Sequence, residues 1–192
     1  MARVLFDMKN TIVITGTPGT GKTRLAAELH KIIKGSVLVN DNEVAKRQGL
    51  IIGKGKYGAL LVDLRKLEIA LNEIARKGKG TVLMEGHLLC EVRVRGAKAI
   101  VLREHLKTLK QRLEKRKYGK DKVLENVVAE ATDYCGQKAM ANYKEVYELL
   151  SSDKRTKLIA LRIASGAKEK QERIELLEEL VKVMKEEGRF SI

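Results

Sequence analysis

One short segment near the amino terminus constrains the fold more than any other part of the chain. Residues 16–23 read GTPGTGKT, a complete phosphate-binding loop of the form G-x-x-x-x-G-K-[ST]. The β-branched run 11–15 leads into this loop, and a helical pattern over 24–30 leads out of it. A strand, a glycine-rich turn and a helix in this order are the setting in which the motif binds phosphate.

The residues of the loop have separate expected roles. Gly19, Thr20 and Gly21 allow backbone N–H groups to point at a polyphosphate, and the following helix adds its positive amino-terminal end. Lys22 is expected to reach the β and γ phosphates, and the Thr23 hydroxyl to take a Mg²⁺ coordination position. The segment therefore predicts binding of a nucleoside triphosphate with Mg²⁺. The alternative is a β-to-α turn that binds nothing.

Composition narrows the class of protein. Hydrophobic residues make up 44% of the 192 residues, which is enough for a core, and no apolar run approaches the length of a membrane-spanning helix. Cys90 and Cys135 are too few and too far apart in the sequence for a disulfide framework or a metal cluster, so we expect buried free thiols. We therefore expect a single cytoplasmic domain over residues 1–192, with no membrane partner.

The charge of the chain is strongly positive. Lys and Arg number 39 against 25 Asp and Glu, which gives a formal net charge of +14. Binding a nucleotide does not need so large an excess, so the charge favours contact with a larger polyanion, RNA first. The alternative is a charge-rich surface of the thermophile kind, on which Lys is merely ahead of Glu.

Short apolar segments alternate with helical patterns along the chain. The expected strands are 11–15, 37–39, 81–84, 98–102 and 158–163, and the expected helices are 22–33, 63–77, 103–116, 121–150 and 167–187. This alternation predicts a three-layer α/β fold around a five-stranded parallel sheet with strand order 2-3-1-4-5. The basic, glycine-containing stretches 40–57 and 115–122 do not fit the alternation. They are expected to be mobile flaps over the phosphate site, or else ordinary surface loops.

A second polar motif follows the strand expected at 81–84. Glu85 stands at the tip of this strand, where phosphate-loop enzymes place an acidic residue that holds the Mg²⁺ shell. His87 follows closely, and a histidine with its ordinary pKa near 6.5 can orient or deprotonate the water that attacks phosphate. A purely structural role for His87 is the alternative.

Taken together, these motifs resemble those of the adenylate kinase isoenzyme 6 family. The resemblance rests on the phosphate loop, the acidic-x-His strand end, and Arg116-Lys117-Tyr118 followed by Lys122 and Glu125-Asn126, and it covers roughly residues 10–187. It implies a fold of the nucleoside monophosphate kinase type, with a monophosphate-binding flap over 39–62 and a short lid over 115–125. It also implies adenylate kinase and ATPase activity with Mg²⁺, ATP and AMP. A further implication is a role in small ribosomal subunit and rRNA maturation, with an S11-type ribosomal protein as partner.

The resemblance also gives roles to single residues. Arg24 would join the loop in binding ATP phosphates. Arg116 would be the lid arginine at the transferring phosphoryl group, with Arg112 one helical turn earlier as a second candidate and a plain surface charge as the alternative. Asn40 and Glu43 match the family's Asn-x-x-acidic run and would bind the nucleoside monophosphate.

Departures from the family pattern leave the function open in part. Glu85 stands where the family usually has Asp, and residues 54–57 read KGKY where the family often has an acidic segment. The backbone of 165–167, after the last expected strand, is the candidate to face adenine. Two other functions stay open. One is an ATP-gated ribosome assembly factor whose kinase activity is incidental, and the other is a kinase for another small metabolite.

Overall fold

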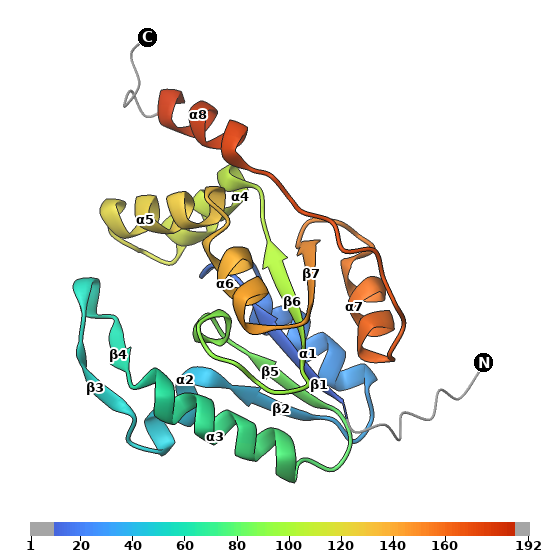
Figure 1. The fold of residues 1–192 in the computed structure, drawn as a ribbon. Coiled ribbons are helices and arrows are strands. Elements are labelled where there is room, and N and C mark those ends of the chain that lie inside the picture. Colours follow the sequence, from blue (N-terminus) through green and yellow to red (C-terminus); the bar gives the residue numbers. More distant parts are fainter. Residues whose placement is uncertain (1–9, 187–192) are drawn as a thin grey trace.

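The computed structural model describes residues 10–186, so both limits of the predicted domain over 1–192 lie outside the described residues. Its centre is a five-stranded parallel sheet in the order β2-β5-β1-β6-β7 (Figure 1). These strands are β1 (Thr11–Thr15), β2 (Val37–Asn40), β5 (Val82–Glu85), β6 (Lys98–Arg103) and β7 (Glu145–Leu150). Counted within this sheet alone, the order is 2-3-1-4-5, which confirms the predicted topology.

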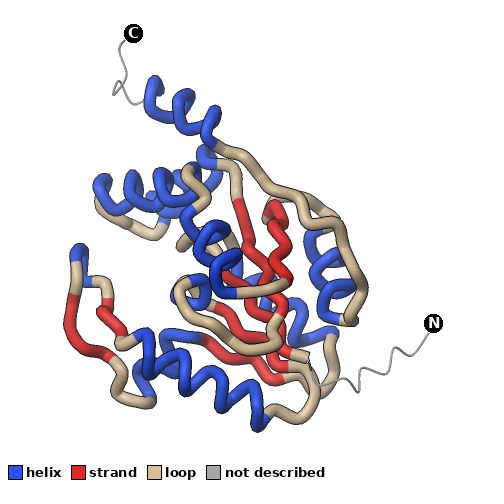
Figure 2. The backbone as a smooth tube through the Cα atoms, viewed as in Figure 1, coloured by secondary structure: helices blue, strands red, loops and turns tan. Residues whose placement is uncertain are grey.

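Two hydrophobic clusters cover the two faces of the sheet. Neighbouring residues of a strand point to opposite faces, so Val13 of β1 packs on one face, and Ile12 and Ile14 on the other. The helices on the Val13 face are α2 (Asp41–Arg47), α3 (Leu64–Lys77) and α6 (Tyr134–Asn142). Those on the opposite face are α1 (Lys22–Ile32) and α7 (Thr156–Ala164). The result is the predicted three-layer α/β fold, with strands between helices (Figure 2).

A third cluster stands at the carboxyl end of the sheet. It consists of α4 (Leu106–Lys115), α5 (Lys120–Ala131) and α8 (Leu177–Glu186), which pack through buried leucine and valine side chains (Figure 1). The phosphate-binding loop follows β1 at this same end, because all five strands run in one direction. Within residues 10–186, no helix combines the length and the apolar character that crossing a membrane requires.

The stretch predicted as a flap has secondary structure of its own. After α2, strands β3 (Ile51–Lys54) and β4 (Leu60–Val62) form an antiparallel hairpin around the short turn η1 (Lys56–Gly58). Lys56 forms an ion pair with Glu125 of α5, so the tip of the hairpin lies beside that helix (Figure 1).

Three predicted elements are wrong in whole or in part. Residues 158–163 belong to helix α7 instead of the fifth strand, because the buried residues Ala160, Ile163 and Ala164 recur at helical spacing. The helix predicted over 121–150 is interrupted where Asp133 takes a left-handed conformation, and its last six residues are the edge strand β7. The helix predicted over 167–187 begins only at Leu177, and residue 187 is not described.

A buried ion cluster explains why β7 was mistaken for a helix. Arg103 of β6 is 1% exposed, and its guanidinium contacts the carboxylates of Glu130, Asp133 and Glu148 at 3.0, 2.7 and 2.9 Å. Glu148 lies in the middle of β7, where an apolar residue would be expected in a covered strand. A buried charge needs such partners, and it removes the apolar pattern by which a strand is recognised.

Candidate functional site

The phosphate-binding loop joins β1 to α1. Gly21, directly before α1, has a left-handed backbone (φ 103°) that other residues rarely adopt. Lys22 is buried, and its ammonium donates a hydrogen bond to the carbonyl oxygen of Thr17 at 2.9 Å. The Thr20 hydroxyl donates to the same oxygen at 3.0 Å. Burial lowers the pKa of Lys22, while the carboxylates of the site oppose this effect.

Three predicted residues from distant parts of the sequence meet beside this loop. The Thr23 hydroxyl donates to Glu85 Oε2 at 3.0 Å, and the Asn40 side-chain amide donates to the other carboxylate oxygen of Glu85. Thr23 lies in the first turn of α1, Glu85 ends β5, and Asn40 ends β2. A hydroxyl and a carboxylate are oxygen ligands of the kind that Mg²⁺ prefers. The pair Thr23 and Glu85 therefore fits the predicted metal.

Asp41 is a residue of this site that the sequence analysis missed. Its carboxylate is fully buried and accepts the backbone N–H groups of Leu88 at 2.8 Å and Asn42 at 2.6 Å. A Cβ atom on Gly86 would overlap this carboxylate, so only glycine lets the two segments approach so closely. Burial raises the pKa of Asp41 to about 6, although the two N–H donors act in the opposite direction. Its place directly after Asn40, in the first turn of α2, was the only available signal.

His87 lies on the exposed rim of the same site. Loss of hydration, together with the positive charges of Lys22 and Lys122, lowers the pKa of His87 to about 4. The imidazole is therefore neutral at pH 7. Since Lys122 belongs to α5, the predicted lid lies near enough to affect this histidine.

Two arginines at the α4 end of the site differ in their contacts. Arg112 donates to the carbonyl oxygen of Gly19 at 3.3 Å and pairs with the carboxylate of Glu104 at 2.8 Å. Glu104 is fully buried just after β6, so the ion pair holds the Arg112 guanidinium against the phosphate loop. Arg116, by contrast, is exposed at the carboxyl end of α4 and forms no ion pair within residues 10–186. The role predicted for Arg116 stays a prediction.

A cleft of about 280 Å³ lies beside the phosphate loop, next to Gly21. Gly21, Arg24 and Leu25 line it together with residues of the segment 151–157, which follows β7 and includes the beginning of α7. The residues predicted to face adenine, 165–167, do not line this cleft, because they follow helix α7 rather than a strand. The segment that does follow the last strand, β7, lines the cleft instead.

The two residues predicted to bind the monophosphate have different surroundings. Asn40 caps α2 by accepting the backbone N–H of Glu43 at 3.0 Å, in addition to its contact with Glu85. The Glu43 carboxylate pairs with Arg47 at 3.5 Å on the exposed surface of the same helix. The structure thus brings Asn40, but not the Glu43 carboxylate, into the cluster around Glu85.

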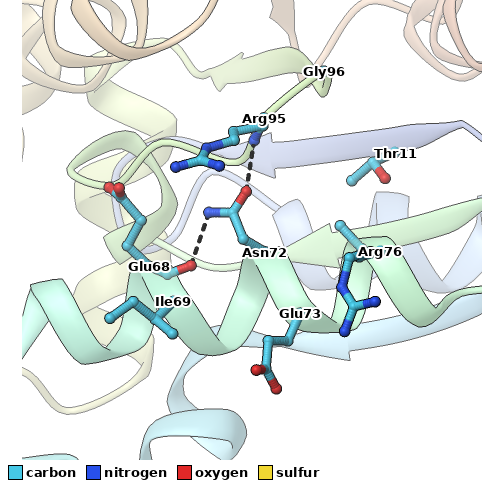
Figure 3. A pocket seen from close by; sticks show the side chains of 9 residues that line it. Thr11, Glu68, Ile69, Asn72, Glu73, Arg76, Arg95 and Gly96 are labelled. Atoms are coloured by element: carbon cyan, nitrogen blue, oxygen red, sulfur yellow. Dashed lines mark hydrogen bonds between the residues drawn. The ribbon is translucent and has the colours of Figure 1, made fainter.

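A larger cleft, of about 580 Å³, lies away from the phosphate loop (Figure 3). Thr11 at the beginning of β1, several residues of α3, and Arg95 line it. Asn72 in this cleft accepts the N–H of Arg95 at 2.9 Å and donates to the carbonyl of Glu68 at 2.8 Å (Figure 3). None of the predicted site residues lines this cleft.

Comparison with known proteins places the chain among phosphate-loop proteins. A family model described as an AAA domain matches residues 12–133, which include the loop, Glu85 and His87. A protein of Methanocaldococcus jannaschii named "Putative adenylate kinase" is 34% identical over 163 residues, covering 84% of this chain and 88% of the relative. The chain belongs to the family of archaeal proteins that carry this name. Another member with the same name, from Pyrococcus furiosus, is 39% identical over 143 residues, covering 74% of this chain and 76% of the relative.

Solved structures agree on the fold alone. Shikimate kinase from Bacteroides thetaiotaomicron superimposes with a TM-score of 0.55 at 16% identity, over 82% of this chain and 96% of that one. The tunicamycin resistance protein of Deinococcus radiodurans has the same TM-score at 17% identity, over 83% and 96% of the two chains. These likenesses confirm the phosphate-loop kinase fold of the chain.

Proposed function

We propose that the chain transfers the γ-phosphoryl group of Mg·ATP to a nucleoside monophosphate, AMP first, and that it also hydrolyses ATP. The observation that carries this proposal is the 3.0 Å hydrogen bond between Thr23 and Glu85, beside the loop that holds Lys22. Phosphate-loop enzymes hold Mg²⁺ with the hydroxyl that follows the loop lysine and with an acidic strand end. The name of the relatives from Methanocaldococcus jannaschii and Pyrococcus furiosus is in accord with the reaction. Membership of the adenylate kinase isoenzyme 6 family in particular is part of this proposal.

Mg²⁺ would be held by the Thr23 hydroxyl and, directly or through a water molecule, by Glu85. When bound, it supplies positive charge to the β and γ phosphates. Asn40 fixes the second carboxylate oxygen of Glu85 and so limits the directions in which this side chain can turn. The Glu85 side chain is one methylene longer than the Asp usual in the family, but hydrogen bonds restrain both of its carboxylate oxygens.

Positioning and charge neutralisation carry the transfer itself, with no covalent intermediate. Lys22 exchanges the carbonyl of Thr17 for phosphate oxygens when ATP binds, and the loop N–H groups cradle the chain of phosphates. Arg112, held by buried Glu104, adds a guanidinium beside the loop. Arg116 joins it when the lid over 115–125 closes. Arg24 stays the candidate to join the loop in binding the ATP phosphates. Together with the segment 151–157 it lines the cleft that takes the adenosine.

The acceptor enters under the flap over 39–62 and contacts Asn40 at the base of the flap. Glu43 can join this contact only if its carboxylate leaves Arg47. The ion pair between Lys56 and Glu125 connects this flap to the lid, so that both can close together. His87, as a neutral imidazole, orients water when the lid closes without an acceptor. This water is the nucleophile of the accompanying ATPase reaction.

The test is an assay that measures AMP-dependent ADP formation and AMP-independent phosphate release on the same preparation. The proposal expects two ADP molecules for each AMP consumed, and a slower release of phosphate without AMP. A panel of other nucleoside monophosphates and small metabolite acceptors identifies the preferred one. ADP formation with a metabolite acceptor but not with AMP would favour the metabolite kinase instead.

A second candidate is an ATP-gated ribosome assembly factor. Exposed basic residues on the flap and around the lid favour it: Lys54, Lys56, Lys107, Lys115, Arg116, Lys117 and Lys120. Such a surface can follow an RNA backbone, and its affinity then falls steeply with salt. The partners would be rRNA of the small subunit and the S11-type protein. Phosphate release without AMP-dependent ADP formation, combined with salt-dependent RNA binding, would favour this function.

A further inference from the structure

The fold brings the two cysteines of the chain together. Cys90 ends the short turn η2 (Leu88–Cys90), and Cys135 lies in the first turn of α6. Both are free thiols in the same hydrophobic cluster, and they are 1% and 7% exposed. The two segments are joined by hydrogen bonds from Asn142 to the carbonyl of Cys90 at 2.8 Å and from the Tyr143 hydroxyl to the carbonyl of Leu89 at 2.7 Å. The two thiols lie close enough for each to shift the pKa of the other.

This thiol pair lies beside both the segment that contains His87 and the phosphate loop. The Cys90 thiol donates to the carbonyl oxygen of His87 at 3.2 Å. Cys135 lies beside Thr17, whose carbonyl holds the Lys22 ammonium at 2.9 Å. The hydroxyls of Thr15 and Thr17 are buried beside the two sulfurs, and neither has a geometrically well-formed hydrogen bond within residues 10–186. The pair is therefore part of a small polar cluster beneath the phosphate loop.

The surroundings distinguish the two thiols chemically. The neighbouring Cys90 thiol and the positive charge of Lys22 lower the pKa of Cys135, whereas the Cys135 sulfur and burial raise the pKa of Cys90. Cys135 therefore ionises more readily than Cys90. A thiolate with a neighbouring second thiol is the arrangement in which oxidation ends as a disulfide.

We propose that Cys90 and Cys135 are a redox modification site, at which a peroxide produces a reversible disulfide that slows nucleotide turnover. The Cys135 thiolate attacks one oxygen of hydrogen peroxide, the O–O bond breaks, and a sulfenic acid and hydroxide result. The Cys90 sulfur then bonds to the Cys135 sulfur, the S–O bond breaks, and the proton of Cys90 leaves with the hydroxyl as water. In sum, two thiols and one hydrogen peroxide give one disulfide and two waters. A dithiol reductant reverses the change.

The disulfide alters both ends of the nucleotide site. The carbonyl of His87 loses its thiol donor, and the two sulfurs move from non-bonded contact to a bond of about 2.05 Å. This movement draws η2 and α6 together beside Thr17 of the loop. Formation of the disulfide does not depend on the proposed function, whereas the effect on turnover rests on it.

The experiment treats the purified full chain with hydrogen peroxide, and measures mass and phosphate release before and after treatment and again after dithiothreitol. We expect the loss of two hydrogen masses, a Cys90–Cys135 peptide in a non-reducing digest, and a fall in turnover of at least about fivefold that dithiothreitol reverses. In Cys90→Ser and Cys135→Ser, the rate of phosphate release after peroxide treatment should equal that of the untreated sample of the same variant.

Each contrary outcome removes a different part of the inference. Peroxide that adds oxygen without joining the two peptides would overturn the modification site, and this readout on the unaltered chain does not depend on whether the variants fold. A complete disulfide with unchanged turnover would overturn the control of activity. A chain that turns over no nucleotide when reduced would contradict the proposed function, while the peptide readout still decides the thiol pair.

Discussion

The Asp41 carboxylate accepts the backbone N–H of Leu88 at 2.8 Å, and this hydrogen bond ties the beginning of α2 to the segment that follows β5. Asp41 is next to Asn40, which contacts Glu85, and Leu88 is next to His87. The base of the flap and the end of the strand that carries the acidic residue are therefore connected by a buried charge. Movement of either segment requires this connection to change.

Gly86→Ala should destabilise the protein. The added Cβ would overlap the Asp41 carboxylate, which is fully buried and cannot turn aside into solvent. We expect a loss of about 2 kcal/mol or more in the free energy of unfolding, measured by urea denaturation. The matched control is Gly53→Ala, because a Cβ there meets only the Leu61 side chain at 3.7 Å, an ordinary contact. Equal stability of the two variants would contradict the close approach at Gly86.

Asp41 should make stability depend on pH in a defined direction. Its folded-state pKa is raised from 3.8 to about 6, so its contribution to stability is fully present below pH 3.8 and is lost as the pH rises through 6. Between pH 7 and pH 5 the unaltered protein should gain about 1 kcal/mol relative to Asp41→Asn. His87 has a lowered pKa and acts in the opposite direction, but its effect is common to both proteins and cancels in the difference. Parallel stability profiles for the two proteins would rule out the shift.

Arg112 should matter more for phosphoryl transfer than Arg116. Buried Glu104 already fixes the Arg112 guanidinium against the loop, whereas Arg116 has to be brought in by lid movement. Removing a positioned donor costs about 100-fold in kcat, so we expect a loss near this size for Arg112→Ala and about tenfold for Arg116→Ala. Steady-state kinetics with AMP as acceptor measures both. A larger loss at Arg116 would assign the fixed role to the lid.

His87→Ala should separate the two activities. The neutral imidazole on the rim can orient water, but transfer to AMP has its nucleophile on the substrate. Phosphate release without AMP is expected to fall about tenfold or more, and AMP-dependent ADP formation to fall much less. Both rates are measured on one preparation, so that loss of folded protein affects them alike. Equal losses in the two rates would refute the assignment.

Local chemistry explains which parts of the fold were predictable. The phosphate loop needs particular residues in a fixed order, and four of the five strands are short apolar runs bounded by polar or glycine residues. The fifth strand was missed because Glu148 is stabilised by Arg103 and Arg173, which belong to distant segments. Partners of this kind exist only after the chain has folded.

Sequence motifs predict only part of the site. Lys22, Thr23 and Glu85 follow from motifs, and the structure brings Thr23 and Glu85 together. Asp41 could not be found in this way, because its importance comes from its contact with the segment around Gly86. The proximity of Cys90 and Cys135 is likewise a property of the packing of α6 on η2, which their spacing in the sequence does not reveal.

In the function proposed for this chain, the loop around Lys22 binds ATP and delivers its terminal phosphoryl group to AMP. The most direct test follows ADP formation from Mg·ATP and AMP with the unaltered chain and with Lys22→Ala, whose folding is checked by its melting transition. We predict steady ADP formation that requires AMP in the unaltered chain, and a loss of at least about 100-fold in the variant. ADP formation that is absent from the unaltered chain, or that survives the loss of the Lys22 ammonium, would contradict the account.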